Sequence, residues 1–388
     1  MGGGQFFVSI LAIGMLLSGT VRADEWRFVV MGDSRGNGAG VNSEILAELV
    51  DDILRRDVDL VVFPGDLVYA ARIGPARFET YLRDWIEVMQ PLYDAGIPVY
   101  VCRGNHEVGD MWDAEPGQLP NPTDNYALRW LHIFGNRDLP QYRLPGDGPP
   151  GEKYMSYSIV HRNALIVGLD QYAGMRSYPA HYVNQGWLTS LLDRNVQPHV
   201  FVFGHEPAFR TLHYDCLDAH PDRRDAFWAA LKSAGARTYF CCHDHYYDHA
   251  RADDGDGNPD NDIHQLIAAT AGAPLYTWTP PYNGDNGAFT VEQLHHAERY
   301  GYLLVEVAGL AVTITWMERQ DGFPFSPGMY LPADTWRYEI PPKNPPCRER
   351  LAGDLNGDCR VDFADLAILA SEWLASGDSL NPPSSAPQ

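Results

Sequence analysis

The chain has 388 residues, enough for two or three domains at about 150 residues each. Hydrophobic residues make up 45% and charged residues 21%, a globular composition that excludes disorder as the dominant state. With 29 basic against 51 acidic residues the formal net charge is −22, which excludes a broad nucleic-acid-binding surface, because phosphate backbones are held by Lys and Arg. A small phosphate-containing ligand stays compatible with this charge, since bound metal cations reverse the local sign.

The N-terminal segment has the pattern of an export signal. Residues 6–17 (FFVSILAIGMLL) form one apolar run, too short to span a bilayer, and small residues follow it up to Ala23. This predicts a signal peptide over residues 1–23. The stretch before the run has no Lys or Arg, so an uncleaved anchor is the alternative. Cleavage would give a secreted, periplasmic or cell-surface protein without a stable membrane span.

The region that follows alternates between short apolar runs and amphipathic stretches. Between the runs, apolar positions recur at a period of 3.6 residues. This alternation of strands and helices predicts a parallel sheet with helices packed on it. The expected strands are residues 26–31, 60–63 and 98–102, and the expected helices begin at Asn42 or Ser43 and at Pro75.

A second strand-and-helix region follows an irregular segment. Residues 108–150, rich in Gly, Pro, Asp and Asn, predict a loop-dominated insertion with Trp112, Tyr126 and Trp130 at a substrate rim. Strands are then expected at 154–160, 164–169, 199–203 and 238–242, and helices at 185–195 and 222–234. Further strands near 264–268, 302–307 and 311–317 are expected to complete a second sheet.

The C-terminal part differs in composition from this main domain, which we place at residues 24–318. Residues 319–350 are rich in proline and predict a wrapping segment and then a linker. Residues 351–376 combine a short acidic motif with a helix, and residues 377–388 predict a disordered tail.

Polar side chains follow five of the predicted strands at the point where each strand ends. Because the carboxyl ends of parallel strands lie along one edge of a sheet, we expect these side chains to converge. Taken singly, each could instead be a turn residue or a hydrogen-bonded loop histidine. Together they offer the ligands that suit Zn, Mn or Fe. They are Asp33, Asp66, Asn105, His205, His243 and His245.

The ordered blocks GDS, GDLVY, GNHE, GHEP and HDHYYD resemble those of the calcineurin-like metallophosphoesterases. GDLVYA, which contains Tyr69, and HDHYYD are most similar to the purple acid phosphatase branch. The blocks span residues 28 to about 250, and residues 271–276 (AGAPLY) are similar to a downstream family segment. The resemblance implies an α/β fold, a four-layer α/β/β/α sandwich with a two-metal site between the sheets.

The resemblance also implies a role for individual residues. One ion would be ligated by Asp33, Asp66, Tyr69 and His245, and the other by Asp66, Asn105, His205 and His243. His106 would face the substrate as general acid or transition-state stabiliser. His213 resembles a histidine that supports the site in the purple branch. The ions would be Fe, Zn or Mn.

Two positions depart from the family pattern. Arg35 stands where many members have a metal-binding histidine, and a protonated guanidinium cannot ligate a cation. It could clamp a phosphate oxygen, or form a surface salt bridge. Cys242 stands where the last block usually begins with glycine.

The reaction that the resemblance implies is hydrolysis of a small phosphate ester. Two cations about 3.5–4 Å apart can hold the attacking and leaving oxygens and lower the pKa of a bridging water, so that hydroxide becomes the nucleophile. Protonated His106 can donate to the leaving group. The hypothesis is an exported, acid phosphatase-like dinuclear phosphoesterase. The alternatives are a phosphodiesterase and a non-catalytic binding or scaffold protein.

The acidic motif at 354–365 places oxygen donors at positions 1, 3, 5, 9 and 12, the spacing of an EF-hand calcium loop. With the following helix it resembles one dockerin repeat, an EF-hand-like module. Cys359 replaces the usual glycine, Asp365 replaces glutamate, and a second repeat is absent from the sequence. The motif predicts Ca²⁺ binding, with a solvated acidic turn as the alternative. A cohesin-like or cell-surface partner stays open. The expected calcium-binding residues are Asp354, Asn356, Asp358, Arg360, Asp362 and Asp365.

A second acidic stretch, residues 253–262 (DDGDGNPDND), also has a calcium-like composition. Pro259 and the irregular spacing favour a plain hairpin loop. Trp278 and Tyr282 could line the substrate cleft, although core packing explains such residues equally well.

Overall fold

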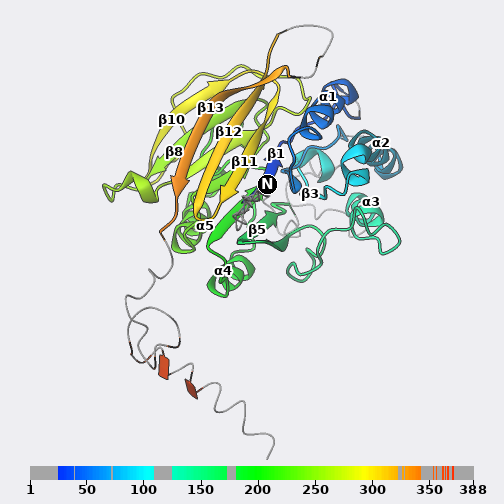
Figure 1. Ribbon diagram of the computed structural model, residues 1–388. Helices are drawn as coiled ribbons and strands as arrows, with labels where there is room; N and C mark the ends of the chain where they lie inside the picture. The colour runs from blue at the N-terminus through cyan, green and yellow to red at the C-terminus, as the bar shows by residue number, and fades with distance from the viewer. Residues whose placement is uncertain are drawn as a thin grey trace, which may run out of the picture.

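The computed structural model describes residues 25–38, 40–70, 73–108, 125–172, 181–321, 326, 328–341 and eight scattered positions from 353 to 370. Two β-sheets lie face to face, and helices pack against them (Figure 1). This mixed α/β architecture agrees with the fold class expected from the sequence.

The first sheet has six strands in the order β13-β12-β11-β1-β2-β3. Its parallel part is β1 (Glu25–Val30), β2 (Leu60–Phe63) and β3 (Val99–Val101). Its antiparallel part is β11 (Gly301–Ala308), β12 (Ala311–Arg319) and β13 (Tyr330–Glu339). Strand β11, late in the chain, therefore pairs with the first strand, β1.

The second sheet has seven strands in the order β10-β8-β9-β7-β6-β5-β4. Its central strands β5 (Ala164–Leu169), β6 (His199–Gly204), β7 (Thr238–Cys241) and β9 (Ile263–Ala268) are parallel. The antiparallel strands are β4 (Tyr157–His161), β8 (Tyr247–Asp253) and β10 (Thr290–Ala297). The parallel centre brings the ends of β6 and β7 to one edge.

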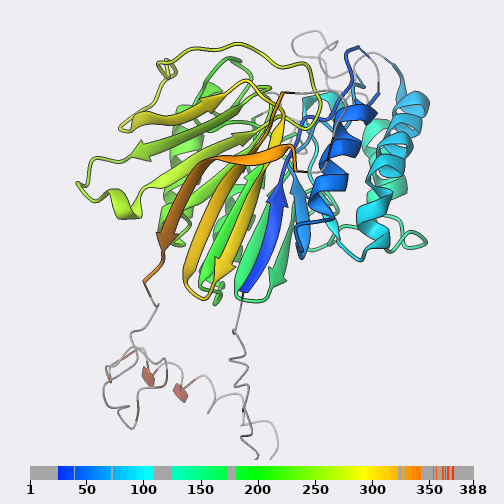
Figure 2. The same ribbon diagram turned by 45° about the horizontal axis from the view of Figure 1, so that its top comes forward.

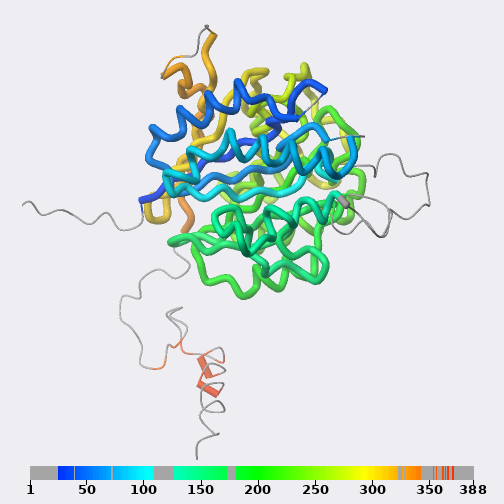
Figure 3. Tube along the Cα trace, turned by 90° about the vertical axis from the view of Figure 1, so that its right-hand side faces the viewer, coloured from blue at the N-terminus to red at the C-terminus, as the bar shows by residue number. Residues whose placement is uncertain are grey.

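Helices cover the outer faces of both sheets. Three of them, α1 (Ser43–Ile53), α2 (Pro75–Asp94) and α3 (Asn125–Phe134), lie in front of the first sheet in Figure 3. The Asn42 side chain caps α1 by accepting the Ile45 N–H, which decides between the two starts, Asn42 and Ser43, that the sequence left open. The second sheet packs its outer face on α4 (Gln185–Asp193) and α5 (Pro221–Ser233). Short 3₁₀ turns occupy Leu217–Ala219 and Pro259–Asn261.

The two faces of β6 show why its sheet is buried on both sides. Phe201 and Phe203 point into the core between the sheets, whereas Val200 and Val202 pack with α4 and α5. Between the sheets, the Phe28 ring lies 5.0 Å from the Phe201 ring. The layers are thus helices, sheet, sheet and helices (Figure 2), and aromatic rings pack between the two sheets.

The sequence placed two strands in the wrong sheet. Strands 302–307 and 311–317 were expected to complete the second sheet, but β11 and β12 belong to the first sheet, where β11 pairs with β1. The prediction also missed β8, β10 and β13. Because β13 lies inside residues 319–350, part of the expected proline-rich wrapping segment is an edge strand of the first sheet.

Within the segment 108–150, the described residues 125–150 include a helix that the composition did not suggest. Helix α3 lies inside it, and Trp130 and Tyr126 are buried in the core rather than at a rim. The ring of Trp130 packs on Phe134, and its Nε1–H donates to the Tyr154 carbonyl at 2.9 Å. Trp112 lies outside the described residues.

Several predictions concern residues outside the described part of the chain. These are the signal peptide, the tail, and calcium-loop residues Asp354, Asn356, Asp358, Arg360 and Asp362. Asp365 is described: it is buried, and its Oδ1 accepts the Leu355 N–H at 2.6 Å. Among the described helices, none combines the length and apolar character that crossing a membrane requires.

One carboxylate links α2 to α3 and gives a pH-dependent prediction. Burial tends to raise the pKa of Glu79, but hydrogen bonds from Arg83, Arg129 and His132 lower it to about 2. Since the ordinary value is 4.5, the stability from this carboxylate is present above pH 4.5 and is lost as pH falls towards 2. Glu79→Gln should lower Tm by about 2–4 °C at pH 7.

The difference in Tm should shrink as the pH of the melting buffer falls from 4.5 to 3. The matched control is Glu87→Gln, an exposed glutamate on the same helix, which should leave Tm nearly unchanged. A deficit in the Glu79→Gln variant that stayed constant from pH 7 to pH 3 would contradict this account.

Candidate metal centre

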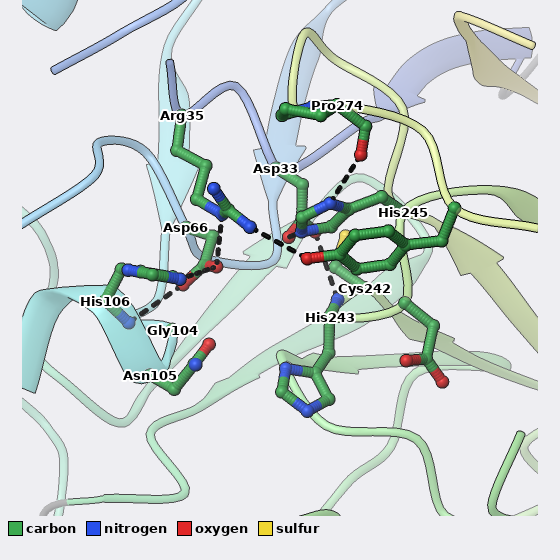
Figure 4. A network of polar contacts seen from close by, with 12 residues as sticks. Asp33, Arg35, Asp66, Gly104, Asn105, His106, Cys242, His243, His245 and Pro274 are labelled. Carbon is green, nitrogen blue, oxygen red and sulfur yellow. Dashed lines mark hydrogen bonds and ion pairs between the residues drawn. The ribbon is translucent and has the colours of Figure 1, made fainter. Parts of the chain in front are cut away.

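The residues expected to converge do so at one edge of the paired sheets. Asp33 and Asp66 follow β1 and β2, and Asn105 follows β3, so these three come from the first sheet. His205 directly follows β6, and His243 and His245 follow β7, so the histidines come from the second sheet. The cluster therefore lies where the two sheets meet (Figure 4).

Asp33 and His245 face each other with unshared electron pairs. His245 Nδ1 lies 2.8 Å from the Pro274 carbonyl, so it carries the proton and leaves a lone pair on Nε2. That Nε2 is 3.3 Å from Asp33 Oδ1, a buried oxygen to which no described residue donates a hydrogen bond. The other Asp33 oxygen accepts the His243 N–H at 3.0 Å. A cation between Asp33 Oδ1 and His245 Nε2 would satisfy both.

The same arrangement recurs around Asp66. His205 Nδ1 donates to the Pro64 carbonyl at 2.8 Å, so its Nε2 lone pair faces Asn105 Oδ1 at 3.0 Å and Asp66 Oδ1 at 3.5 Å. With its amide turned over, Asn105 would donate to Asp66 at 3.2 and 3.3 Å and to His205 Nε2 at 3.0 Å, and would satisfy these acceptors itself. With a cation bound by Asp66 and His205, the Asn105 Oδ1 would face the ion instead.

These donor sets fit metal ions. One ligand atom each from Asp33, Asp66 and His205 lies within 4.8 Å of the others, and all three residues are buried. Carboxylate and imidazole donors suit Zn, Mn and Fe. The buried negative charge also needs compensation, because isolated ionised carboxylates are costly in the interior.

His243 is held by a residue that the sequence did not single out. Its Nε2 lies 3.3 Å from Asp215 Oδ1, so Nδ1 is the nitrogen that could bind a metal ion once it gives up its proton. Burial lowers the pKa of His243, but Asp215 outweighs this and raises it to about 10. The residue has a φ of +77°, and the preceding Cys242 fits because it packs against Gly32, whose hydrogen atom leaves room for Sγ.

Arg35 lies inside the site, not in a surface salt bridge. It is 8% exposed, and its Nε is 3.7 Å from Asp66 Oδ2. Its Nη2 donates to the Tyr276 hydroxyl at 3.1 Å, and the guanidinium lies 5.4 Å from the centre of the Tyr69 ring. Arg35 therefore contributes a fixed positive charge beside the carboxylates.

Tyr69 and His106 form one wall of the site. Their ring centres are 4.8 Å apart, and the Tyr69 N–H donates to the Gly40 carbonyl at 2.7 Å. The His106 N–H donates to Asp66 Oδ1 at 3.0 Å, and its Nε2 is 3.7 Å from Asp66 Oδ2. Burial lowers the pKa of His106 to about 4. His106 thus lies beside Asp66 with an unpartnered Nδ1.

His213 lies on the opposite wall. Its Nδ1 is hydrogen-bonded to the Asp244 carboxylate, which also accepts a hydrogen bond from the Thr211 hydroxyl. The His213 ring is 5.0 Å from the His243 ring and 5.4 Å from Tyr276. Tyr276 in turn stacks on His245 with ring centres 4.2 Å apart. Asp244 and Tyr276 were present in quoted blocks of the sequence, but their roles were missed.

Glu107, quoted only as part of GNHE, fixes the two loops that carry Asp66 and Asn105. It is fully buried and accepts the N–H groups of Asp66 at 2.9 Å, Val68 at 3.1 Å and Gly104 at 2.7 Å. Burial raises the pKa of Glu107. Gly104 packs so closely that a Cβ there would collide with Asp66 Oδ1. Both loops therefore require this exact backbone.

Comparison with protein families gives one match. The profile described as calcineurin-like phosphoesterase matches residues 27–247, which include the expected metal ligands. No curated protein sequence matches the chain.

Solved structures share the fold at low sequence identity. The purple acid phosphatase PPD1 from yellow lupin (Lupinus luteus) seeds is 13% identical with a TM-score of 0.58, over 82% of this chain and 54% of that chain. GAP50, described as the anchor in the inner membrane complex of Plasmodium, is 13% identical with a TM-score of 0.56. The match covers 94% of this chain and 99% of that chain. A dimetal phosphatase from Danio rerio is 14% identical with a TM-score of 0.50. The match covers 81% of this chain and 99% of that chain. This chain spans about half the length of the lupin phosphatase.

Proposed function

Because the chain belongs to the calcineurin-like phosphoesterase family, we propose that it is a two-metal phosphoesterase acting on small phosphate esters. The observation that carries this proposal is the facing pair of acceptors Asp33 Oδ1 and His245 Nε2, together with the convergence of Asp33, Asp66 and His205 on one point. Such pairs repel unless a cation lies between them.

In this proposal Asp33, Asp66, Tyr69 and His245 hold one transition-metal ion, and Asp66, Asn105, His205 and His243 hold the other. When bound, Fe, Zn or Mn ions would supply positive charge for the phosphate oxygens and activate water for hydrolysis. The Pro64 and Pro274 carbonyls and Asp215 fix which nitrogen of each histidine faces the ions.

The surrounding side chains would act on the substrate. His106, which lies beside Asp66 and Tyr69, is our candidate for protonating the leaving-group oxygen. Arg35 offers guanidinium N–H groups to a phosphate oxygen, and Tyr276 orients them through its hydroxyl. His213, held by Asp244, is a second donor on the opposite wall.

We further propose that the enzyme is exported by residues 1–23 and that its subtype is acid phosphatase-like. The C-terminal motif at 354–365 would bind Ca²⁺ in a dockerin-like repeat and attach the enzyme to a cohesin-like or cell-surface partner. These proposals rest on sequence patterns, and each can be tested apart from catalysis.

The proposal is tested by metal content and substrate choice together. Purified protein should contain about two transition-metal ions per chain, and chelation should remove at least about 99% of activity, because the ions supply several kcal/mol of transition-state stabilisation. Hydrolysis of 4-nitrophenyl phosphate is compared with that of bis(4-nitrophenyl) phosphate after single metals are added back. Faster monoester hydrolysis supports a phosphatase, and faster diester hydrolysis supports a phosphodiesterase.

A visible absorption band that disappears in Tyr69→Phe would identify a phenolate on Fe(III). A colourless, iron-free and active enzyme would indicate Zn or Mn instead.

A non-catalytic scaffold is the second candidate, and one contact favours it. Arg35 already places a cation 3.7 Å from Asp66, where many family members have a ligand. The fold is also shared with the Plasmodium protein described as an anchor. A protein that binds less than one ion per chain and hydrolyses neither ester with any added metal would support this candidate and contradict the enzyme.

A further inference from the structure

A second group of carboxylates lies far from the candidate metal centre, in the loop between β8 and β9. One oxygen each from Asp253, Asp254 and Asp262 lies within 4.8 Å of the others. The loop projects from the sheets at the left of Figure 1, where it is coloured yellow-green. Since β8 has seven residues, the loop lies about 20 Å from His245.

Asp262 is the feature that separates this loop from an ordinary acidic turn. The residue is 3% exposed, and its Oδ1 has no hydrogen-bond partner in the described part of the chain. Its nearest cation is Arg251, whose Nε is 3.8 Å from Oδ2, beyond hydrogen-bond distance, while the Nη2 of Arg251 pairs with Glu292 at 2.8 Å. A buried carboxylate oxygen without a partner is costly, and here it lies beside two further carboxylates.

A neighbouring buried oxygen also lacks a hydrogen-bond donor among the described residues. Asn261 Oδ1 is buried without a partner, although its Nδ2 donates to Asp256 Oδ2 at 2.8 Å. Burial and the nearby charge of Asp253 raise the pKa of Asp262, which reflects uncompensated negative charge. Asp253 and Asp254 each accept a backbone N–H of the loop, at 2.8 and 3.2 Å, whereas Asp262 Oδ1 and Asn261 Oδ1 find no donor among the described residues.

We propose that the β8–β9 loop binds one Ca²⁺ ion through Asp253, Asp254 and Asp262, as a structural site separate from the catalytic metals. Ca²⁺ takes six to eight oxygen ligands in a flexible geometry, whereas Zn, Mn and Fe favour sites that include nitrogen. The three carboxylates carry the charge that such an ion needs. Bound there, Ca²⁺ holds the ends of β8 and β9 together.

Lys232 is the cation that competes for this loop. Its Nζ contacts Asp254 and lies 3.0 Å from Asp256 Oδ2. If the loop is only a hairpin fastened by lysine, removing that charge should loosen it and no Ca²⁺ should bind. If the loop is a calcium site, removing the charge should tighten Ca²⁺ binding. The two accounts therefore predict opposite results from one substitution.

The test uses the full chain with Asp354→Ala and Asp362→Ala, which silence the expected C-terminal calcium loop. With the catalytic site first loaded with Mn²⁺, calorimetric titration with Ca²⁺ should show one site of about 10⁻⁴ M affinity or tighter. At 100 times Kd, Ca²⁺ should raise Tm by about 5 °C. Asp262→Asn in this background should abolish both effects, and Lys232→Gln should tighten binding about tenfold or more.

The matched control is Asp193→Asn, which removes one exposed charge at the end of α4 and should leave Ca²⁺ binding unchanged. The proposal is overturned if the background protein binds no Ca²⁺, if Asp262→Asn binds it as well as the background does, or if Lys232→Gln weakens binding. Equal affinity for Mg²⁺ would also overturn it. None of these readouts depends on phosphatase activity.

Discussion

Asp66→Asn should lower kcat/KM for a phosphate ester by at least about 10³-fold, a loss of about 4 kcal/mol of transition-state stabilisation. Asp66 is the residue proposed to contact both ions, and its carboxylate already lies within 4 Å of His106, His205 and Arg35. An amide keeps the size but removes the negative charge. Steady-state kinetics and metal content per chain, measured on the same preparation, check the prediction.

The control for this variant must match its backbone as well as its chemistry. Asp66 has a φ of +51°, a left-handed conformation that asparagine tolerates, and exposed Asp57 has a φ of +53°. Asp57→Asn should therefore retain full activity and both metals. Near-normal turnover in Asp66→Asn would remove this carboxylate from the catalytic site.

Gly104→Ala should be nearly as damaging, although it changes no charged group. The added methyl group would collide with Asp66 Oδ1, and it would lie 2.8 Å from His205 Cε1. The adjacent Gly65 approaches the Gly104 backbone at a φ of +90°, so neither loop can retreat. Overpacking of this kind costs about 1–3 kcal/mol of stability. We expect a lower Tm and the loss of most bound metal and activity.

Gly186→Ala is the matched control, because an added Cβ on α4 would meet no atom within 4 Å. That substitution should leave metal content unchanged and hold or slightly raise Tm, since alanine favours a helix. Retention of two ions and full turnover in Gly104→Ala would show that the loops around Asp66 are more adaptable than their packing indicates.

The parallel strands were predictable because their residues are apolar and polar side chains follow at once. β2 is LVVF and leads directly to Asp66, and β6 is HVFVFG and leads to His205. The missed strands lack that signal. β10 (TVEQLHHA) and β13 (YLPADTWRYE) are largely polar edge strands of their sheets, and β13 contains Pro332.

β8 was missed for a different reason. It is buried, but it reads YDHARAD, because its polar side chains are satisfied inside the protein. The Tyr282 hydroxyl donates to Asp248, and His249 Nδ1 pairs with Asp334 at 2.8 Å. Hydrophobic periodicity cannot detect a strand whose burial depends on hydrogen bonds from distant segments.

The positions of the expected metal ligands were predictable from strand ends, whereas their supports were not. Arg35 meets Tyr276 across 241 residues, and His243 meets Asp215 across 28. The first contact joins loops of the two sheets and the second joins two loops of the second sheet, and no spacing along the chain encodes either. The sequence also could not show that Arg35 would be buried beside Asp66.

The proposed ligands are divided between the two sheets. The aromatic rings packed between the sheets therefore influence the distance between the proposed ion positions. Asp33, Asp66 and Asn105 travel with one sheet and the three histidines with the other, and Phe28, Phe201 and Phe240 keep the sheets apart. Smaller or larger rings there would shift one half of the coordination sphere against the other. Substitutions of these rings, which lie away from the substrate, should therefore change the activity of the proposed metal centre.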